Sequence, residues 1–201
     1  FEALRRAAEA PGGILAAVAD STNATKETAS RSEGELREAL IERLGEVGDR
    51  RLAVASFSSN IARISTLFEI AKTLDRHPVL VGRSLVRMVA AARECGHLPS
   101  LDSEVHPRDF AYLPPDKTML ICTGTQGEPG SATDRISRDD HRDIALDPGD
   151  LVLFSSKIIP GNEAEIERLH ANLRQRRYEV VSELEGFVHV SGHPGRPELR
   201  R

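Results

Sequence analysis

The chain has 201 residues, 39% of them hydrophobic, and a formal net charge of −4. This length and apolar content suit one large α/β domain or two small ones, and the negative charge argues against a protein that coats nucleic acid by bulk electrostatics, while leaving room for a local basic groove. The two cysteines, Cys95 and Cys122, suggest neither a disulfide framework nor a four-ligand zinc site, so we expect a protein of a reducing cytoplasm. No apolar run approaches the roughly 20 residues that span a bilayer, so we expect no membrane partner.

Short apolar runs typical of buried strands alternate with longer stretches of helical periodicity. From the N-terminus, the expected strands are Ile14–Ala19, Leu52–Phe57, Val79–Val81, Met119–Cys122, Leu151–Phe154, Glu179–Ser182 and Phe187–Val190. The expected helices are Glu33–Glu46, Asn60–Asp75, Leu85–Cys95 and Glu163–Arg176, and the stretch His97–Pro115 is expected to be an irregular crossover with one helical turn near Asp109–Tyr112. Strand followed by helix, repeated, predicts an α/β fold with a mostly parallel, doubly wound sheet.

Cap signals mark several helix starts. Ser32 and Glu35 have the spacing of a capping box. Ser84 is expected to cap the third helix, and Asn162 with Glu165 to cap the fourth.

Small polar residues and glycines follow almost every expected strand. They are Asp20–Asn23, Ser56–Asn60, Gly82–Ser84, Thr123–Glu128, Ser155–Lys157 with Pro160–Glu163, and His189–His193. Any one of these groups is more often a helix cap than a ligand site. Because the carboxyl ends of parallel strands meet at one edge of a sheet, the whole set favours a surface that binds phosphate or another polyanion.

Four residues are candidates for chemistry, and three of them have a plainer alternative. His189 and His193 flank a small-residue turn, although a histidine in a strand is usually structural. Asp20 would by default form an Asx-turn with Thr22. Glu35 is explained by the capping box, which leaves Glu33 freer to act.

No Walker, G-x-G-x-x-G, G-x-S-x-G or H-E-x-x-H pattern is present, so nucleotide hydrolysis, dinucleotide binding and serine-hydrolase chemistry lose their usual support.

Seven ordered motifs span nearly the whole chain: Asp20–Ala24, Ser56–Ile64, Val81–Ser84, Thr123–Pro129, Phe154–Ser156, Ile159–Glu163 and His189–His193. Their order and spacing closely resemble the ribonuclease J family, and the set is far more specific than any single motif. Thr125 stands where the family's motif has serine, and it retains the hydroxyl.

The resemblance implies a β-CASP domain inserted into a metallo-β-lactamase domain. Residues 1–30 would be a remnant of the metallo-β-lactamase domain, 31–188 the β-CASP domain, and 189–201 the start of the return. It implies a cytoplasmic ribonuclease that degrades 5′-monophosphorylated single-stranded RNA from the 5′ end, also cuts internally, and uses two Zn²⁺ or Mn²⁺ ions to activate water. The parent could be a homo-oligomer.

The resemblance also implies residue roles. Asp20 would bridge the two metals, with Glu33 and His193 as the other catalytic residues. His189, Ser191 and Gly192 would hold a substrate phosphate. The remaining RNA-binding candidates, on the β-CASP surface, are Ser58, Ser59, Asn60, Arg83, Ser84 and Ser156.

The family's main metal ligands come from an H-x-H-x-D-H motif and further histidines that this sequence lacks. One aspartate cannot hold a pair of divalent ions. We therefore expect the chain alone to be catalytically inert and to bind no metal tightly. The alternatives are a non-catalytic module that binds RNA or a protein, and a small-molecule enzyme on a flavodoxin-like sheet, for which no nucleophile with an adjacent base is evident.

Overall fold

A computed structural model describes residues 2–16, 18, 20–100 and 103–200. The chain divides into two compact units, Arg31–Val190 and the smaller Phe1–Ser30 with Ser191–Arg201. The predicted domain boundaries at 30/31 and 188/189 remain a prediction, because this division does not identify the domain to which the smaller unit belongs. No helix in the described part of the chain is both long and apolar enough to cross a bilayer.

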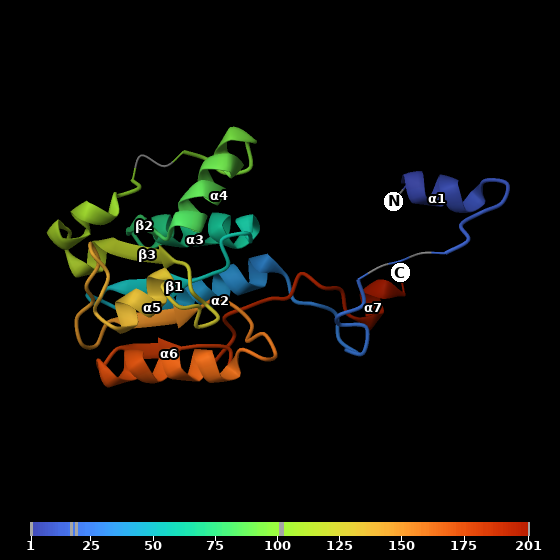
Figure 1. Ribbon diagram of the computed structural model, residues 1–201. Helices are drawn as coiled ribbons and strands as arrows, with labels where there is room; N and C mark the ends of the chain where they lie inside the picture. The colour runs from blue at the N-terminus through green and yellow to red at the C-terminus, as the bar shows by residue number, and fades with distance from the viewer. Residues whose placement is uncertain (1, 17, 19, 101–102, 201) are drawn as a thin grey trace. The chain divides into compact units, whose positions relative to one another are not determined.

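The larger unit is built on a five-stranded sheet in which every neighbouring pair is parallel (Figure 1). The strands lie in the order β2-β3-β1-β4-β5. Their bounds are β1 Leu52–Ala55, β2 His77–Val81, β3 Thr118–Cys122, β4 Leu151–Phe154 and β5 Glu179–Val181. Almost every strand residue is buried, as expected when helices cover both faces of a parallel sheet. The predicted α/β class and doubly wound sheet are confirmed.

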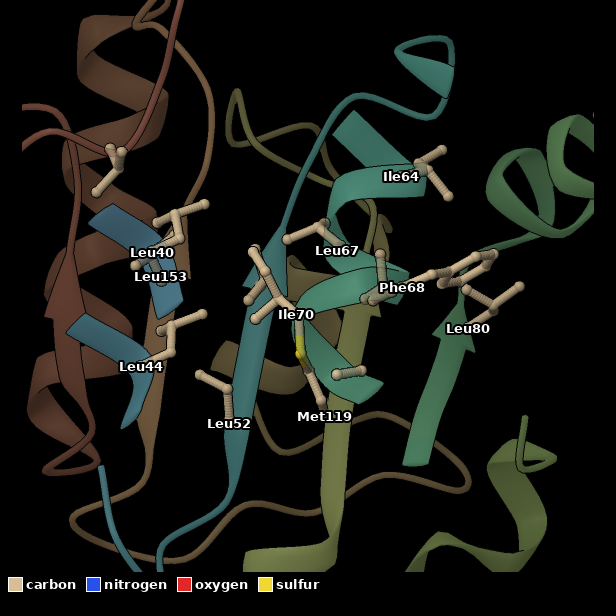
Figure 2. Packing of buried hydrophobic residues seen from close by; sticks show 14 of the residues in the cluster. Leu40, Leu44, Leu52, Ile64, Leu67, Phe68, Ile70, Leu80, Met119 and Leu153 are labelled. Atoms are coloured by element: carbon tan, nitrogen blue, oxygen red, sulfur yellow. The ribbon is translucent and has the colours of Figure 1, made fainter. Parts of the chain in front are cut away.

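Helices α2 (Glu33–Gly45), α3 (Ile61–Thr73) and α4 (Arg83–Glu94) pack on one face of the sheet. Figure 2 shows Leu40 and Leu44 of α2 and Leu67 and Ile70 of α3 in one cluster with the β1 residue Leu52 and the β3 residue Met119. Helices α5 (Ala132–Ser137) and α6 (Glu163–Gln175) pack on the other face, together with the 3₁₀ helix η1 (Pro107–Tyr112). Burying each leucine contributes roughly 1.5–3 kcal/mol, so both faces stabilise the fold.

The chain changes face at the edge of the sheet beside β2. After α4 it returns along this edge, where Val105 forms a parallel bridge with Val79 of β2, and then enters η1 on the opposite face. A second short 3₁₀ helix, η2 (Pro115–Lys117), leads into β3. As a result, the neighbouring strands β3, β1 and β4 lead into helices on alternate faces. In open α/β sheets, ligands bind beyond the carboxyl ends of strands that alternate in this way.

Two expected strands are wrong. Residues 14–16 and 18 form no strand, and Leu15 and Val18 are fully exposed; Ala17 and Ala19 lie outside the described residues. Phe187–Val190 also forms no strand, although Val188 is buried. An apolar run becomes a strand only where a neighbouring strand takes up its backbone N–H and C=O groups, and within the described residues neither run has such a neighbour.

The expected helices are confirmed to within two residues at each end, and the capping box of Ser32 and Glu35 is present. Ser84 does not cap α4, because it lies inside the first turn and Gly82 holds the cap position. Asn162 does hold the cap position of α6, but its side chain makes no capping hydrogen bond. Three short helices, α1 (Glu2–Glu9), α5 and α7 (Arg196–Leu199), were not predicted from the sequence.

Two glycines in the loop after β3 allow a matched test of packing at this edge. Gly127 and Gly130 have the same left-handed backbone, with φ of +73° and +74°. An added Cβ would lie 2.5 Å from backbone atoms of Glu165 at Gly127, but would meet nothing within 4 Å at Gly130. We expect Gly130→Ala to cost about 1 kcal/mol of unfolding free energy from backbone strain alone, and Gly127→Ala about 2 kcal/mol more. Urea denaturation measures both values, and equal losses would contradict the packing described here.

Candidate functional site

The carboxyl edge of the sheet gathers the polar groups that follow each strand. Val81, Cys122, Ala55 and Phe154 are in register across β2, β3, β1 and β4. The next residues, Gly82, Thr123, Ser56 and Ser155, therefore form a row. At about 4.8 Å per strand, the row is roughly 14 Å long.

Six of the predicted RNA-binding residues lie at this edge, but they differ in accessibility. Ser59, Arg83 and Ser84 are exposed, Ser58 and Asn60 are partly exposed, and Ser156 is buried. Asn60 is also the N-cap of α3, where its side chain accepts a hydrogen bond of 3.0 Å from the backbone N–H of Arg63. Burial argues against direct ligand contact by Ser156, while the exposed members are placed to contact a ligand.

Gln126 joins the loops that follow β3 and β4. Its amide nitrogen donates to the Lys157 carbonyl at 3.0 Å, and its amide oxygen accepts from the backbone N–H of Ile159 at 3.0 Å. Thr125 beside it is buried, and its hydroxyl accepts from the Gln126 amide at 3.2 Å. These contacts give Thr125 and Gln126 a structural role, which is to hold the two loops together.

Glu33 forms a two-pronged ion pair with Arg63, whose side chain is completely buried. The guanidinium also donates to the hydroxyl of Ser155 at 2.7 Å and to its carbonyl at 3.1 Å. Sequence reasoning left Glu33 free to act and assigned nothing to Arg63. The one available signal was an arginine within the apolar face of α3, next to Ile64.

In the smaller unit, the Asp20 carboxylate contacts His193 and Thr22. One oxygen accepts from the backbone N–H of Thr22 at 2.9 Å and from its hydroxyl at 2.7 Å, which is the expected Asx-turn. The other oxygen contacts His193 Nδ1. The hydrogen bond to His193, followed by those from Thr22, lowers the pKa of Asp20 well below its usual range.

Asn23 holds the loop that carries His193. Its buried amide donates at 3.0 Å both to the Ser191 hydroxyl and to the His193 carbonyl. The Ser30 hydroxyl donates to the same carbonyl at 2.9 Å. Gly192 is exposed, and an added Cβ there would meet nothing within 4 Å. The structure thus brings Asp20, Ser191 and His193 together, and Asn23 is a positioning residue that sequence reasoning did not single out.

His189 belongs to the larger unit and is partly buried. It directly follows Val188, whose carbonyl accepts a hydrogen bond of 2.8 Å from the Ser155 hydroxyl. Among residues 2–16, 18, 20–100 and 103–200, no group of three or more His, Cys, Asp or Glu side chains could hold a metal ion. Asp20 and His193 offer two adjacent donors, fewer than a zinc ion requires.

A cavity of about 520 Å³ lies away from these residues, at the ends of α5 and α6. It is lined by Ser137, Arg138, Asn172, Gln175 and Arg176. Both guanidiniums already contact aspartates, at 3.0 Å for Arg138 with Asp134 and 3.5 Å for Arg176 with Asp139. We therefore place the candidate site at the carboxyl edge, where the exposed polar groups converge.

Comparison with known proteins gives concordant matches. The model of the family described as "Ribonuclease J, beta-CASP domain" matches residues 49–173. The chain is 39% identical over 189 residues to Ribonuclease J of Sinorhizobium meliloti, covering 94% of this chain and 33% of that protein. It is 41% identical over 188 residues to Ribonuclease J of Mycolicibacterium smegmatis, covering 93% and 34%. The chain thus spans about a third of the length of these curated relatives.

The Asp20–His193 contact predicts how the Asp20 carboxyl titrates. The lowered pKa means that the folded smaller unit favours the ionised form of Asp20. The pairing therefore stabilises the folded unit fully above the ordinary aspartate pKa, and this stabilisation is lost as the pH falls through the lower pKa of the folded state. We expect His193→Ala to raise the pKa of Asp20, and Thr22→Val to raise it by less. A ¹³C NMR pH titration of the Asp20 carboxyl carbon measures this. A midpoint that His193→Ala does not move would contradict the contact.

Proposed function

Because the chain belongs to the ribonuclease J family, with the β-CASP domain at residues 49–173, we propose that it is the RNA-holding part of a metal-dependent ribonuclease. The whole protein would act in RNA processing and decay, as a 5′-to-3′ exonuclease and an endonuclease, in the cytoplasm. Its substrate would be single-stranded RNA, preferably with a 5′-monophosphate, and it could assemble as a homo-oligomer.

The observation that supports RNA binding is the carboxyl edge of the sheet. Helices α3 and α4 both begin there, so their first backbone N–H groups and the positive ends of their dipoles face this edge. Arg83 and Lys157 add exposed positive charge, and neither forms an ion pair with a described carboxylate. Exposed hydroxyls of Ser59 and Ser84 complete a set of donors suited to backbone phosphates.

Such a surface would read little of the base sequence. The chain has no tryptophan, two tyrosines and six phenylalanines, and base stacking on aromatic rings is the usual source of binding to bases. Phosphate contacts fix the register of a strand but carry no sequence information directly. We propose that RNA is held here by its backbone.

The catalytic residues belong to a separate proposal. In the whole protein, two Zn²⁺ or Mn²⁺ ions would supply activated water, with Asp20 as a ligand and His193 stabilising or protonating the departing oxygen. The two donors described here do not by themselves suffice for a metal pair. His189, Ser191 and Gly192 are proposed to bind a phosphate, and Glu33 to act through its hydrogen bonds.

RNA binding can be tested by fluorescence anisotropy with a 5′-monophosphorylated RNA oligonucleotide at several salt concentrations. We expect Arg83→Ala to weaken binding by about three- to tenfold and to reduce the salt slope by about 1, because one phosphate contact is lost. Arg43→Ala is the matched control, since Arg43 lies in the last turn of α2 and pairs with Glu179 at the opposite edge of the sheet. Equal effects of the two substitutions would contradict the proposed surface.

The chain alone should bind RNA without cutting it. Labelled 5′-monophosphorylated RNA, incubated with the chain and either Mn²⁺ or Zn²⁺, is expected to keep its length on a denaturing gel. Metal-dependent shortening that disappears in Asp20→Ala would show that the chain supplies a complete metal site, contrary to this expectation. Absence of both binding and cleavage would count against an RNA-holding role altogether.

A further inference from the structure

We propose that Arg63 is a positioning residue for His189, acting through Ser155 and the peptide that joins Val188 to His189. Arg63 and His189 are 126 positions apart in the sequence and belong to the same compact unit. The inference uses the proposed function only for the importance of His189, because the contacts themselves require no ligand.

The guanidinium of Arg63 is fixed in place from several directions. Its side chain is fully buried at the start of α3, where Asn60 caps the helix and binds the backbone N–H of Arg63. Glu33 neutralises its charge through both carboxylate oxygens. A buried arginine that lost this partner would be strongly unfavourable, so the pair also fixes the first turn of α2.

Ser155 links the fixed guanidinium of Arg63 to residues 187–190. Its hydroxyl accepts from Arg63 Nη1 at 2.7 Å and donates to the Val188 carbonyl at 2.8 Å. Ser155 itself is buried, and its backbone N–H is tied to Ala55 of β1 at 2.8 Å. Because the Val188 carbonyl and the His189 N–H share one planar peptide group, this hydrogen bond orients the backbone of His189.

A second contact joins the same two segments. The guanidinium of Arg31 lies 3.5 Å from the centre of the Phe187 ring. Residues 31–33 and 187–188 are therefore held together twice, once by this cation–π contact and once through Arg63 and Ser155. The segment needs such anchors because it pairs with no strand in the described part of the unit.

The test compares Ser155→Ala with Ser137→Ala in the chain as it stands. Both serines are buried, but the Ser137 hydroxyl donates only within α5, to the Asp134 carbonyl. We expect amide hydrogen exchange in residues 187–190 to become about tenfold faster in Ser155→Ala and to stay unchanged in Ser137→Ala. The imidazole NMR resonances of His189 should move, while those of His170, which packs against Phe154, should not.

Arg63→Lys is the second variant, since a lysine cannot satisfy Glu33 and Ser155 together. In Arg63→Lys, amide hydrogen exchange should become faster both in residues 187–190 and in the first turn of α2. In Ser155→Ala, which keeps the Arg63–Glu33 pair, it should become faster in residues 187–190 only. If Arg63→Lys fails to fold, Ser155→Ala still decides the matter. Unchanged exchange at 187–190 in Ser155→Ala, or exchange that rises equally in β4 and α3, would overturn the proposal. A local effect without any RNA binding by the chain would leave the positioning role standing and count against the proposed function.

Discussion

An all-parallel sheet constrains everything else in the larger unit. Parallel neighbours cannot be joined by a tight hairpin, so each connection must cross a face of the sheet, and here helices fill most of that distance. Both faces of the sheet are therefore buried, and most polar side chains lie at the ends of the strands. Since every strand points the same way, the loops after β1 to β4 and the starts of α3, α4 and α6 meet at the carboxyl edge. The concentration of hydroxyls, amides and positive charge there is a product of topology as much as of sequence.

Within that edge, the buried guanidinium of Arg63 links parts of the chain that lie far apart in sequence. An exposed salt bridge such as Arg37–Glu69 contributes little, because water screens it. Arg63 differs because it is wholly buried and its partners are a carboxylate, a hydroxyl and a carbonyl with fixed positions. An ion pair of this kind gives little net stability, but it is intolerant of displacement. It serves better to fix geometry than to hold the fold together.

Much of the fold could be predicted from local pattern. The apolar runs that form β1 to β5 can be recognised without knowing which strands they pair with. The Ser32 capping box and the Asp20 Asx-turn depend only on residues two or three positions apart. The features that could not be predicted depend on distant partners. The expected strand Ile14–Ala19 has no neighbour to pair with at its described residues, Ser156 is covered by packing, and Glu33 is bound by an arginine 30 positions away. The smaller unit's Asn23 could be recognised as a positioning residue only once the His193 loop lay against it.

The contact between Arg31 and Phe187 has a consequence for how the larger unit can be connected to other protein. Its first and last segments meet, so the unit begins and ends at nearly the same point. A domain with adjoining ends can interrupt a host chain while separating the host's flanking residues only slightly, and the loop-closure entropy of such an insertion rises slowly with its length. The same geometry would let the unit be circularly permuted with a short linker, and it makes residues 31–190 a natural module for transfer into another scaffold.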